Sequence, residues 1–406
     1  MKKRITLKQF LFLLPMLALI TVFSLYPILS SFVYTVFDYR TNDRQTNQLF
    51  LSGSMNTDLF AENCDYIDYF LRDDLTLVAD QDAQVFETVC TKMAETKKQL
   101  EGAEGKKLNQ EEIENLRGLM QDTRIQLDSV YNSYPDVSFY NKDKVFVILD
   151  EMETCFIDSN FVGLANYQKL LSDHRFSVTL KNTLFFTAIT VAVEFVLGMG
   201  LALVMSQALR GIGLIRTAVL IPWAIPTAVS ALIWSYLYDG SSGIIAQLFY
   251  HLGLCASPQQ MLLSASGAMV SAIIADIWKT TPYMALLLLA GLQSIDPGLY
   301  ESAAIDGSGK VHTFFNITMP MMKSSILIAL LFRTLDAFRV YDLIAILTGG
   351  GPGGATETLS IYAYKVMMSQ SNYGYGSVIV VAMFVCVAVI AFFFIKVLGA
   401  EVMQDD

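Results

Sequence analysis

The stretch TLFFTAITVAVEFVLGMGLALVMS, residues 183–206, decides the class of fold. It carries a single ionisable residue, Glu194, among side chains that are otherwise apolar, small or hydroxylated. A bilayer core of about 30 Å needs about 20 such residues in a helix, because lipid offers no partner for an unpaired backbone group. The stretch is therefore predicted to be a membrane-spanning helix.

Five other stretches have a similar length and a similar apolar character. They are residues 10–37, 215–238, 266–292, 325–347 and 377–398. The first follows a basic N-terminus, as a signal peptide does, but its apolar run exceeds the roughly 7 to 15 residues of such a segment, so it is predicted to remain as an anchor. The chain is therefore expected to be an all-α membrane protein with six transmembrane helices.

Composition supports this class and divides the chain. Hydrophobic residues make up 53% and charged residues 16%, which argues against a conventional soluble enzyme. Residues 38–177 hold 26 acids and 14 bases, whereas the remainder has a net charge of +2. Three parts follow: a tail and first helix at 1–37, an acidic insert at 38–177, and a five-helix core at 178–406. A nucleic-acid partner is excluded because no basic face is concentrated anywhere.

Basic residues near the span ends predict the orientation, because Lys and Arg are retained on the cytoplasmic side in short loops. Six crossings place every such cluster on one side and return the C-terminus to it. Both termini are expected in the cytoplasm, and the insert outside. The residues that carry this inference are Lys2, Lys3, Arg4, Lys8, Arg210, Arg216, Lys310 and Lys323.

The insert carries a helical signal over residues 85–130. A turn containing Gly102 and Gly105 is expected to join two antiparallel helices, which either only pack on each other or bind a partner. Cys64, Cys90 and Cys155 could form one disulfide outside the cell, with the pair left open. The apolar stripes are Phe86, Val89, Met93 and Leu100, then Ile113, Leu116, Met120, Thr123, Leu127 and Val130.

Motifs for catalysis are absent from the sequence. The run DGSGK at 306–310 resembles a phosphate-binding loop, but Ala304 and Val311 occupy the positions of the required glycine and hydroxyl. The three histidines are scattered over distant segments, so no zinc spacing exists. No catalytic residue, metal site or cofactor bound by this chain is predicted.

The loop ESAAIDGSGKVHTFFNITMP, residues 301–320, is the longest on the cytoplasmic side. Glu301 and Asp306 favour a helix start, and Gly307 breaks the helix. Phe314, Phe315 and Ile317 are expected to be exposed on the segment that follows. Such a helix either docks in a protein pocket or lies on lipid.

Ionisable residues inside predicted spans are the second candidate site. Such charge costs about 2.5 to 3.5 kcal/mol per residue, so it indicates function by default. Arg333, Asp336, Arg339 and Asp342 recur every three residues, so each base can meet an acid along one helix flank. Asp276 and Lys279 lie at similar depth in the preceding span. These groups either line a polar passage or form a structural ion-pair network.

The 301–320 loop resembles the EAA motif of binding-protein-dependent ABC importer permeases. The carbohydrate branch of these permeases, with its maltose-permease-F-like and glycerol-phosphate-permease-A-like members, is similar in three further segments. They are residues 163–171, 278–283 and 347–359. The resemblance covers residues 1–37 and 160–400, with small departures at Ser302, Ser308 and Met319. The matching positions of the motif are Glu301, Ala303, Asp306, Gly307, Phe314, Ile317 and Pro320.

This resemblance implies the type I importer permease fold in a bacterial cytoplasmic membrane. The matching loop would be a coupling helix held by a cytoplasmic ATPase dimer, which binds the ATP and Mg²⁺. A second permease subunit in a heterodimer and a periplasmic substrate-binding protein are the other partners implied. The cargo would be a sugar, an oligosaccharide or a polyol derivative, moved by alternating access.

The resemblance also implies which positions hold the cargo. Tyr283 is the one identical in type, whereas Ala337 and Val340 stand where polar amides are expected. Two other functions stay open on the residues alone: a secondary transporter using Glu194, Asp276 and Asp336, or a membrane sensor with an outer ligand-binding hairpin. The implied pathway positions are Asp276, Thr280, Tyr283, Arg333, Ala337 and Val340, to which the charge row adds Asp336.

Overall fold

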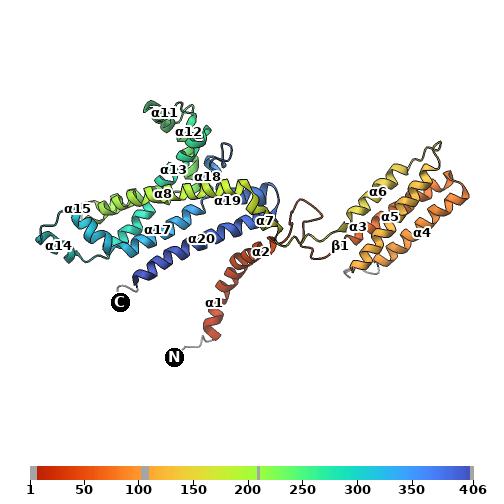
Figure 1. The fold of residues 1–406 in the computed structure, drawn as a ribbon, viewed down its shortest axis with the longest axis horizontal. Coiled ribbons are helices and arrows are strands. Elements are labelled where there is room, and N and C mark those ends of the chain that lie inside the picture. The colour runs from red at the N-terminus through yellow and green to blue at the C-terminus, as the bar shows by residue number, and fades with distance from the viewer. Residues whose placement is uncertain (1–6, 102–108, 208–210, 403–406) are drawn as a thin grey trace. The chain divides into compact units, whose positions relative to one another are not determined.

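The computed structural model describes residues 7–101, 109–207 and 211–402. It is almost entirely helical and divides into two compact units (Figure 1). The larger unit comprises residues 1–32, 167–370 and 375–406, and the smaller one residues 33–166 with 371–374.

Four helices and a short strand pair form the smaller unit. β1 (Ser54–Met55) pairs antiparallel with β2 (Phe156–Ile157), Ser54 opposite Ile157. The helices lie side by side, with α3 contacting both α4 and α6 (Figure 1). They are α3 (Thr57–Asp74), α4 (Asp80–Glu101), α5 (Gln110–Asn132) and α6 (Lys142–Thr154).

The predicted hairpin corresponds to α4 and α5, and its two apolar stripes are buried except for the half-buried Leu116. Asn109 begins α5 with a reciprocal capping box to Glu112. The expected turn at residues 102–108 lies outside the described part of the chain. The hairpin does not pack only on itself, because α3 and α6 share its core. Phe60, Cys64, Ile67 and Leu71 have the heptad spacing that could have revealed α3.

The cysteines of this unit are free thiols that lie in its core. Burial is the main reason that the pKa of Cys64 and of Cys90 is raised to about 12 and that of Cys155 to about 11. A thiol with so high a pKa holds little reactive thiolate near neutral pH. The disulfide that the sequence left open is therefore not formed in this structure.

The larger unit holds the apolar helices. Four of its helices are long and apolar enough to cross a membrane: residues 12–34, 174–206, 265–293 and 373–397. Two bent helix pairs among the described residues, 212–224 with 227–237 and 310–321 with 323–338, raise the number to six if each pair is one span. In Figure 1, α8, α17 and α20 run alongside one another. The helices of this unit and its borders are α1 (Leu7–Ile20), α2 (Tyr26–Tyr34), α7 (Ala165–Ser172), α8 (His174–Ser206), α9 (Ile212–Ala224), α10 (Thr227–Leu237), α11 (Ile244–His251), α12 (Gln260–Leu263), α13 (Ala265–Gln293), α14 (Pro297–Ile305), α15 (Lys310–Thr313), α16 (Met319–Met321), α17 (Lys323–Phe338), α18 (Asp342–Leu347), α19 (Leu359–Tyr364) and α20 (Tyr373–Val402).

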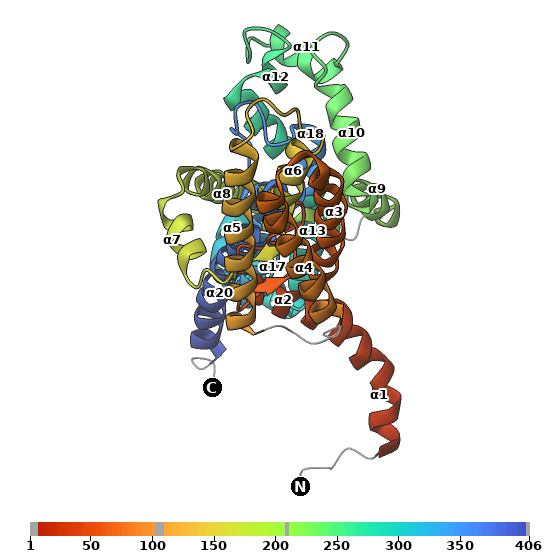
Figure 2. The same cartoon turned by 90° about the vertical axis from the view of Figure 1, so that its right-hand side faces the viewer.

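Two predicted spans are not continuous helices. The span expected at 215–238 is α9 and α10, which meet at 89° around Ile225 and Pro226 (Figure 2). Pro226 has no N–H to continue the helical hydrogen bonding, and its ring disfavours helical backbone at Ile225. The span expected at 325–347 is α17 and α18, interrupted at residues 339–341. Both interruptions border the charged site.

Candidate functional site: a charged cavity between broken helices and the 301–320 loop

One arginine holds three helices together inside the larger unit. The Arg333 guanidinium of α17, of whose surface 1% is exposed, donates to both carboxylate oxygens of Glu194 on α8, with Nη2 2.9 Å from Oε1. Nη2 also donates to the Asp276 carboxylate of α13. Nη1 lies 3.2 Å from Oδ2 of Asp336. Because these bonds reach α8 and α13, the cluster links α17 to both helices.

The row of alternating charges predicted on one helix flank forms only in part. Arg333 and Asp336 pair as expected, but Arg339 donates to the Leu335 carbonyl at 3.1 Å instead of to a carboxylate. Arg339 ends α17, so Asp342 begins a separate helix and the three-residue spacing no longer places the two on one flank. The sequence placed Glu194 only among the carboxylates of the secondary-transporter alternative, but in the structure both of its carboxylate oxygens bind Arg333.

A cavity of about 350 Å³ opens beside this cluster. Six of the seven predicted pathway residues line it, the exception being Tyr283. Tyr283 instead stacks on the lining residue Trp223, with ring centroids 5.6 Å apart and planes 15° from parallel. The lining residues are Trp223, Thr227, Asp276, Lys279, Thr280, Arg333, Asp336, Ala337, Arg339, Val340, Tyr341, Asp342 and Leu343.

The cavity combines aromatic faces with both signs of charge. Trp223 and Tyr341 offer flat apolar surface, while the Asp336 side chain, 62% exposed, and Arg339 offer an acceptor and donors. Small-molecule sites are typically built from apolar walls with a few placed polar groups. Carboxylate and guanidinium groups hydrogen-bond hydroxyls, and the tryptophan face packs on aliphatic C–H groups, so the lining suits a polyhydroxylated molecule. Sequence reasoning missed Trp223, although Pro222 and Pro226 on either side of it signal a broken helix.

The loop at 301–320 is a second candidate site. Asp296 begins α14 by accepting the Gly298 N–H, and Pro297 occupies the first turn. The predicted helix start at Glu301 and Asp306 is therefore wrong: Glu301 lies within α14, and Asp306 is its C-terminal cap. Gly307 follows with a positive φ of 75°, which explains why the helix ends there.

The apolar residues of this loop are divided between the core and the surface. Phe314 and Ile317, predicted to be exposed, are half-buried, and Phe314 packs on the core formed by α8, α13 and α17. Phe315 is exposed as predicted, and Ile305 and Val311 join it with 87% and 72% exposed. Among the other motif residues, Ala303 is buried, whereas Glu301, Asp306 and Pro320 are exposed. The loop therefore packs on the spans through one face and presents apolar side chains on another.

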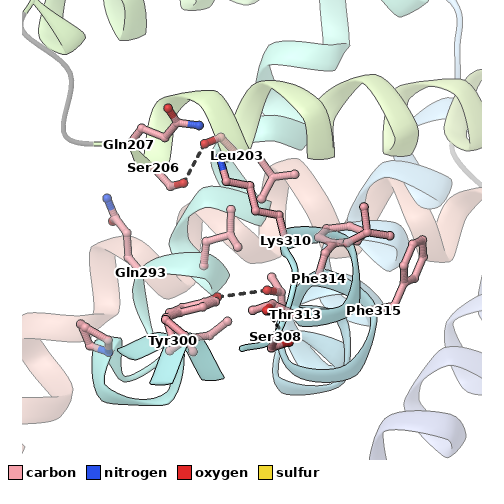
Figure 3. A pocket seen from close by; sticks show the side chains of 16 residues that line it. Leu203, Ser206, Gln207, Gln293, Tyr300, Ser308, Lys310, Thr313, Phe314 and Phe315 are labelled. Atoms are coloured by element: carbon pink, nitrogen blue, oxygen red, sulfur yellow. Dashed lines mark hydrogen bonds between the residues drawn. The ribbon is translucent and has the colours of Figure 1, made fainter. Parts of the chain in front are cut away.

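A pocket of about 830 Å³ separates this loop from the ends of α8 and α13 (Figure 3). Tyr300 and Thr318 hydrogen-bond across it at 3.2 Å, and Ser308 bonds Thr313 at 3.0 Å. Phe314 and Phe315 lie next to each other with ring centroids 5.0 Å apart. The Tyr300–Thr318 bond thus holds α14 to the segment that follows Gly307, and the Ser308–Thr313 bond lies within that segment.

Comparisons with known proteins agree on the core. A family model described as "binding-protein-dependent transport system inner membrane component" matches residues 194–404. The trehalose/maltose transport system permease protein MalF of Thermococcus litoralis is 42% identical over 263 residues, 62% of this chain and 88% of that protein. The trehalose transport system permease protein SugA of Mycobacterium tuberculosis is 45% identical over 243 residues, 60% of this chain and 76% of that protein.

A solved structure supports the fold. A bacterial ABC transporter involved in the import of the acidic polysaccharide alginate superposes with a TM-score of 0.54 at 22% identity, covering 59% of this chain and 84% of that chain. The family match begins at Glu194 and so leaves the insert outside it. Because it takes in more than half of the chain, including the charged cavity and the 301–320 loop, the chain belongs to the family of inner membrane components of binding-protein-dependent transport systems, as a non-catalytic permease subunit.

Proposed function

We propose that the chain imports a sugar, an oligosaccharide or a polyol derivative through the cavity beside Arg333, by alternating access. The observation that carries this proposal is the cavity itself, where aromatic faces and hydroxyl-binding groups line the break between α9 and α10. Two similar permeases, one of a trehalose/maltose transport system and one of a trehalose transport system, support the sugar class. A discontinuous helix is where transporters commonly bind cargo.

The 301–320 loop is proposed to couple the spans to a cytoplasmic ATPase dimer, which binds ATP and Mg²⁺. Exposed Ile305, Val311 and Phe315 would fill an apolar cleft, and the packed face would pass the motion to α8 and α13. A single chain supplies one such loop for the two clefts of an ATPase dimer, so a second permease subunit is required. The termini are proposed to lie in the cytoplasm, on the same side as this loop.

Proton-coupled transport is the alternative that the charge cluster favours least. Glu194 and Asp276 are both bonded to Arg333, and a carboxylate that carries protons has to release such a partner in each cycle. The sensor alternative leaves the 301–320 loop without a role. ATP-driven import accounts for the cavity and the loop together.

A labelling experiment tests the cavity as the cargo site. Val340 lines the cavity and is half-buried, so Val340→Cys in the complex purified through a tag on this chain should react with a water-soluble methanethiosulfonate. Trehalose or maltose should slow that reaction by occupying the same space. Ser241→Cys, which is exposed between α10 and α11 and does not line the cavity, is the control and should gain no sugar protection. Equal labelling of Val340→Cys with and without every sugar tested would overturn the assignment.

The insert is proposed to help capture the substrate-binding protein from outside. Its net charge of −12 over residues 38–177 would attract a partner with a basic contact face, and such steering weakens as salt screens it. Deleting the α4–α5 hairpin would expose the core that it shares with α3 and α6, so surface charge is the better variable.

Neutralising exposed acids of α5 tests this capture. Glu114→Gln, Asp122→Asn and Asp128→Asn together should slow association with the binding protein at low salt by about tenfold or less, since electrostatic steering acts on the association rate. Biolayer interferometry at about 20 mM and at about 500 mM salt would measure the association rate, because the higher salt concentration screens the charges over a shorter distance. Unchanged association at both salt concentrations would leave the insert without a role in capture.

A further inference from the structure

The break between α9 and α10 leaves backbone carbonyls without helical hydrogen bonds inside the apolar part of the chain. The last carbonyls of a helix have no donors within the helix. In water they would be hydrated, but lipid supplies no hydrogen bond, and each unsatisfied group costs several kcal/mol. α9 ends at Ala224, within a pair of helices that together are long and apolar enough to span a membrane.

The ammonium group of Lys279 on α13 lies at the carbonyls of this break. Its Nζ donates to the Ile225 carbonyl at 2.8 Å and lies 3.4 Å from the Trp223 carbonyl. Lys279 is 7% exposed and forms no ion pair with any carboxylate among the described residues. Asp276, one turn away on the same helix, is bonded by Arg333 instead. A cation placed against the C-terminal end of a helix also complements its dipole.

The two carbonyls that Lys279 binds belong to the peptide segment that carries Trp223. Trp223 lines the cavity and is 44% exposed, so its indole position is not fixed by burial. The indole position depends on stacking against the Tyr283 ring and on the backbone segment that carries Trp223. Tyr283 itself is one turn beyond Lys279 on α13, so one helix supplies both supports.

We propose that Lys279 is a positioning residue: its ammonium group closes the broken end of α9 and thereby fixes Trp223 as the aromatic wall of the cargo cavity. The proposal rests on the proposed function of that cavity. It makes Lys279 act through Trp223 and not through direct contact with cargo. The competing role is that of a counter-charge for Asp276 and Asp336, which would act on the cavity's charge alone.

A double-mutant cycle in the purified complex separates these roles. Each variant is made together with Val340→Cys, and the trehalose concentration that halves methanethiosulfonate labelling is measured. Lys279→Met should raise that concentration about tenfold, and Trp223→Leu by a similar factor, which corresponds to about 1.4 kcal/mol each. If Lys279 acts through Trp223, then Lys279→Met in the Trp223→Leu background should change the concentration by less than about twofold.

Two further arms keep the result decisive. The counter-charge role predicts that Asp336→Asn restores Lys279→Met, whereas positioning predicts no restoration. If Lys279→Met does not assemble, Lys279→Arg, which keeps the charge but changes the donor geometry, carries the same cycle. Additive effects in the cycle, or restoration by Asp336→Asn, would overturn the proposal. No sugar protection in the parent Val340→Cys protein would instead contradict the proposed function.

Discussion

Replacing Arg333 with methionine is expected to prevent the chain from assembling as a stable membrane protein. The substitution keeps an unbranched side chain but leaves Glu194, with none of its surface exposed, and Asp276 facing each other without a cation. Removing one partner of a buried ion pair costs about 3 to 5 kcal/mol, and two partners are orphaned here. Whole proteins are stable by only about 5 to 15 kcal/mol, so this is the largest effect of any single substitution considered.

Fluorescence-detected size exclusion after stepwise heating would measure the loss. Arg339→Met is the matched control, because Arg339 is an exposed base near the same helix end whose side chain hydrogen-bonds a backbone carbonyl. The triple variant Arg333→Met, Glu194→Gln, Asp276→Asn should recover assembly, since neutral amides remove the orphaned charge. Arg333→Met that melts within about 2 °C of the parent would show that the cluster contributes little to stability.

Gly307→Pro is expected to abolish coupled transport while leaving the chain inserted. Gly307 has φ +75°, and proline is locked near −65°, so the turn between α14 and α15 cannot form. A Cβ at this position would meet nothing within 4 Å, so the effect comes from the backbone and not from crowding. The exposed residues on either side, Ile305 and Val311, would lose their relative placement.

Gly309→Pro is the matched control for this loop. Gly309 has φ −72°, which proline adopts without strain, and it is the N-cap residue that precedes α15, outside the helical hydrogen bonding. Sugar uptake and ATP hydrolysis should be measured together in vesicles that hold the purified complex. Uptake should fall more than about a hundredfold for Gly307→Pro, as expected if the coupling geometry is lost. Coupled uptake at the parent rate would contradict the role of the loop.

Sequence patterns predicted the apolar helices well because burial in lipid leaves a long, continuous signal. Residues 183–206 and 266–292 lie within α8 and α13. These helices begin directly after their N-cap residues, Asp173 and Ser264. The interruptions at Ile225 and Arg339 were not predicted, because hydropathy averages over about 20 residues and a break changes only two or three of them. The flanking prolines carried that signal for the first interruption alone.

The charged cluster was predicted only in part, because most of its bonds join residues that are distant in the sequence. Spacing along one helix gives Arg333 and Asp336, which are three residues apart, but the stronger bond joins Arg333 to Glu194 across 139 residues of chain. No local pattern encodes such a pair. Likewise, the hairpin α4–α5 follows from its apolar stripes, whereas its packing with α3 and α6 depends on tertiary contacts.

Uptake into vesicles with two energy sources measures whether an ATPase drives sugar import through this chain. The complex purified through a tag on this chain is reconstituted with ATP or with a non-hydrolysable analogue inside, its binding protein and labelled trehalose or maltose outside, and with or without an imposed proton gradient. We expect uptake that requires hydrolysable ATP and is unaffected by an uncoupler. Uptake without ATP that follows the proton gradient and collapses with the uncoupler would contradict it.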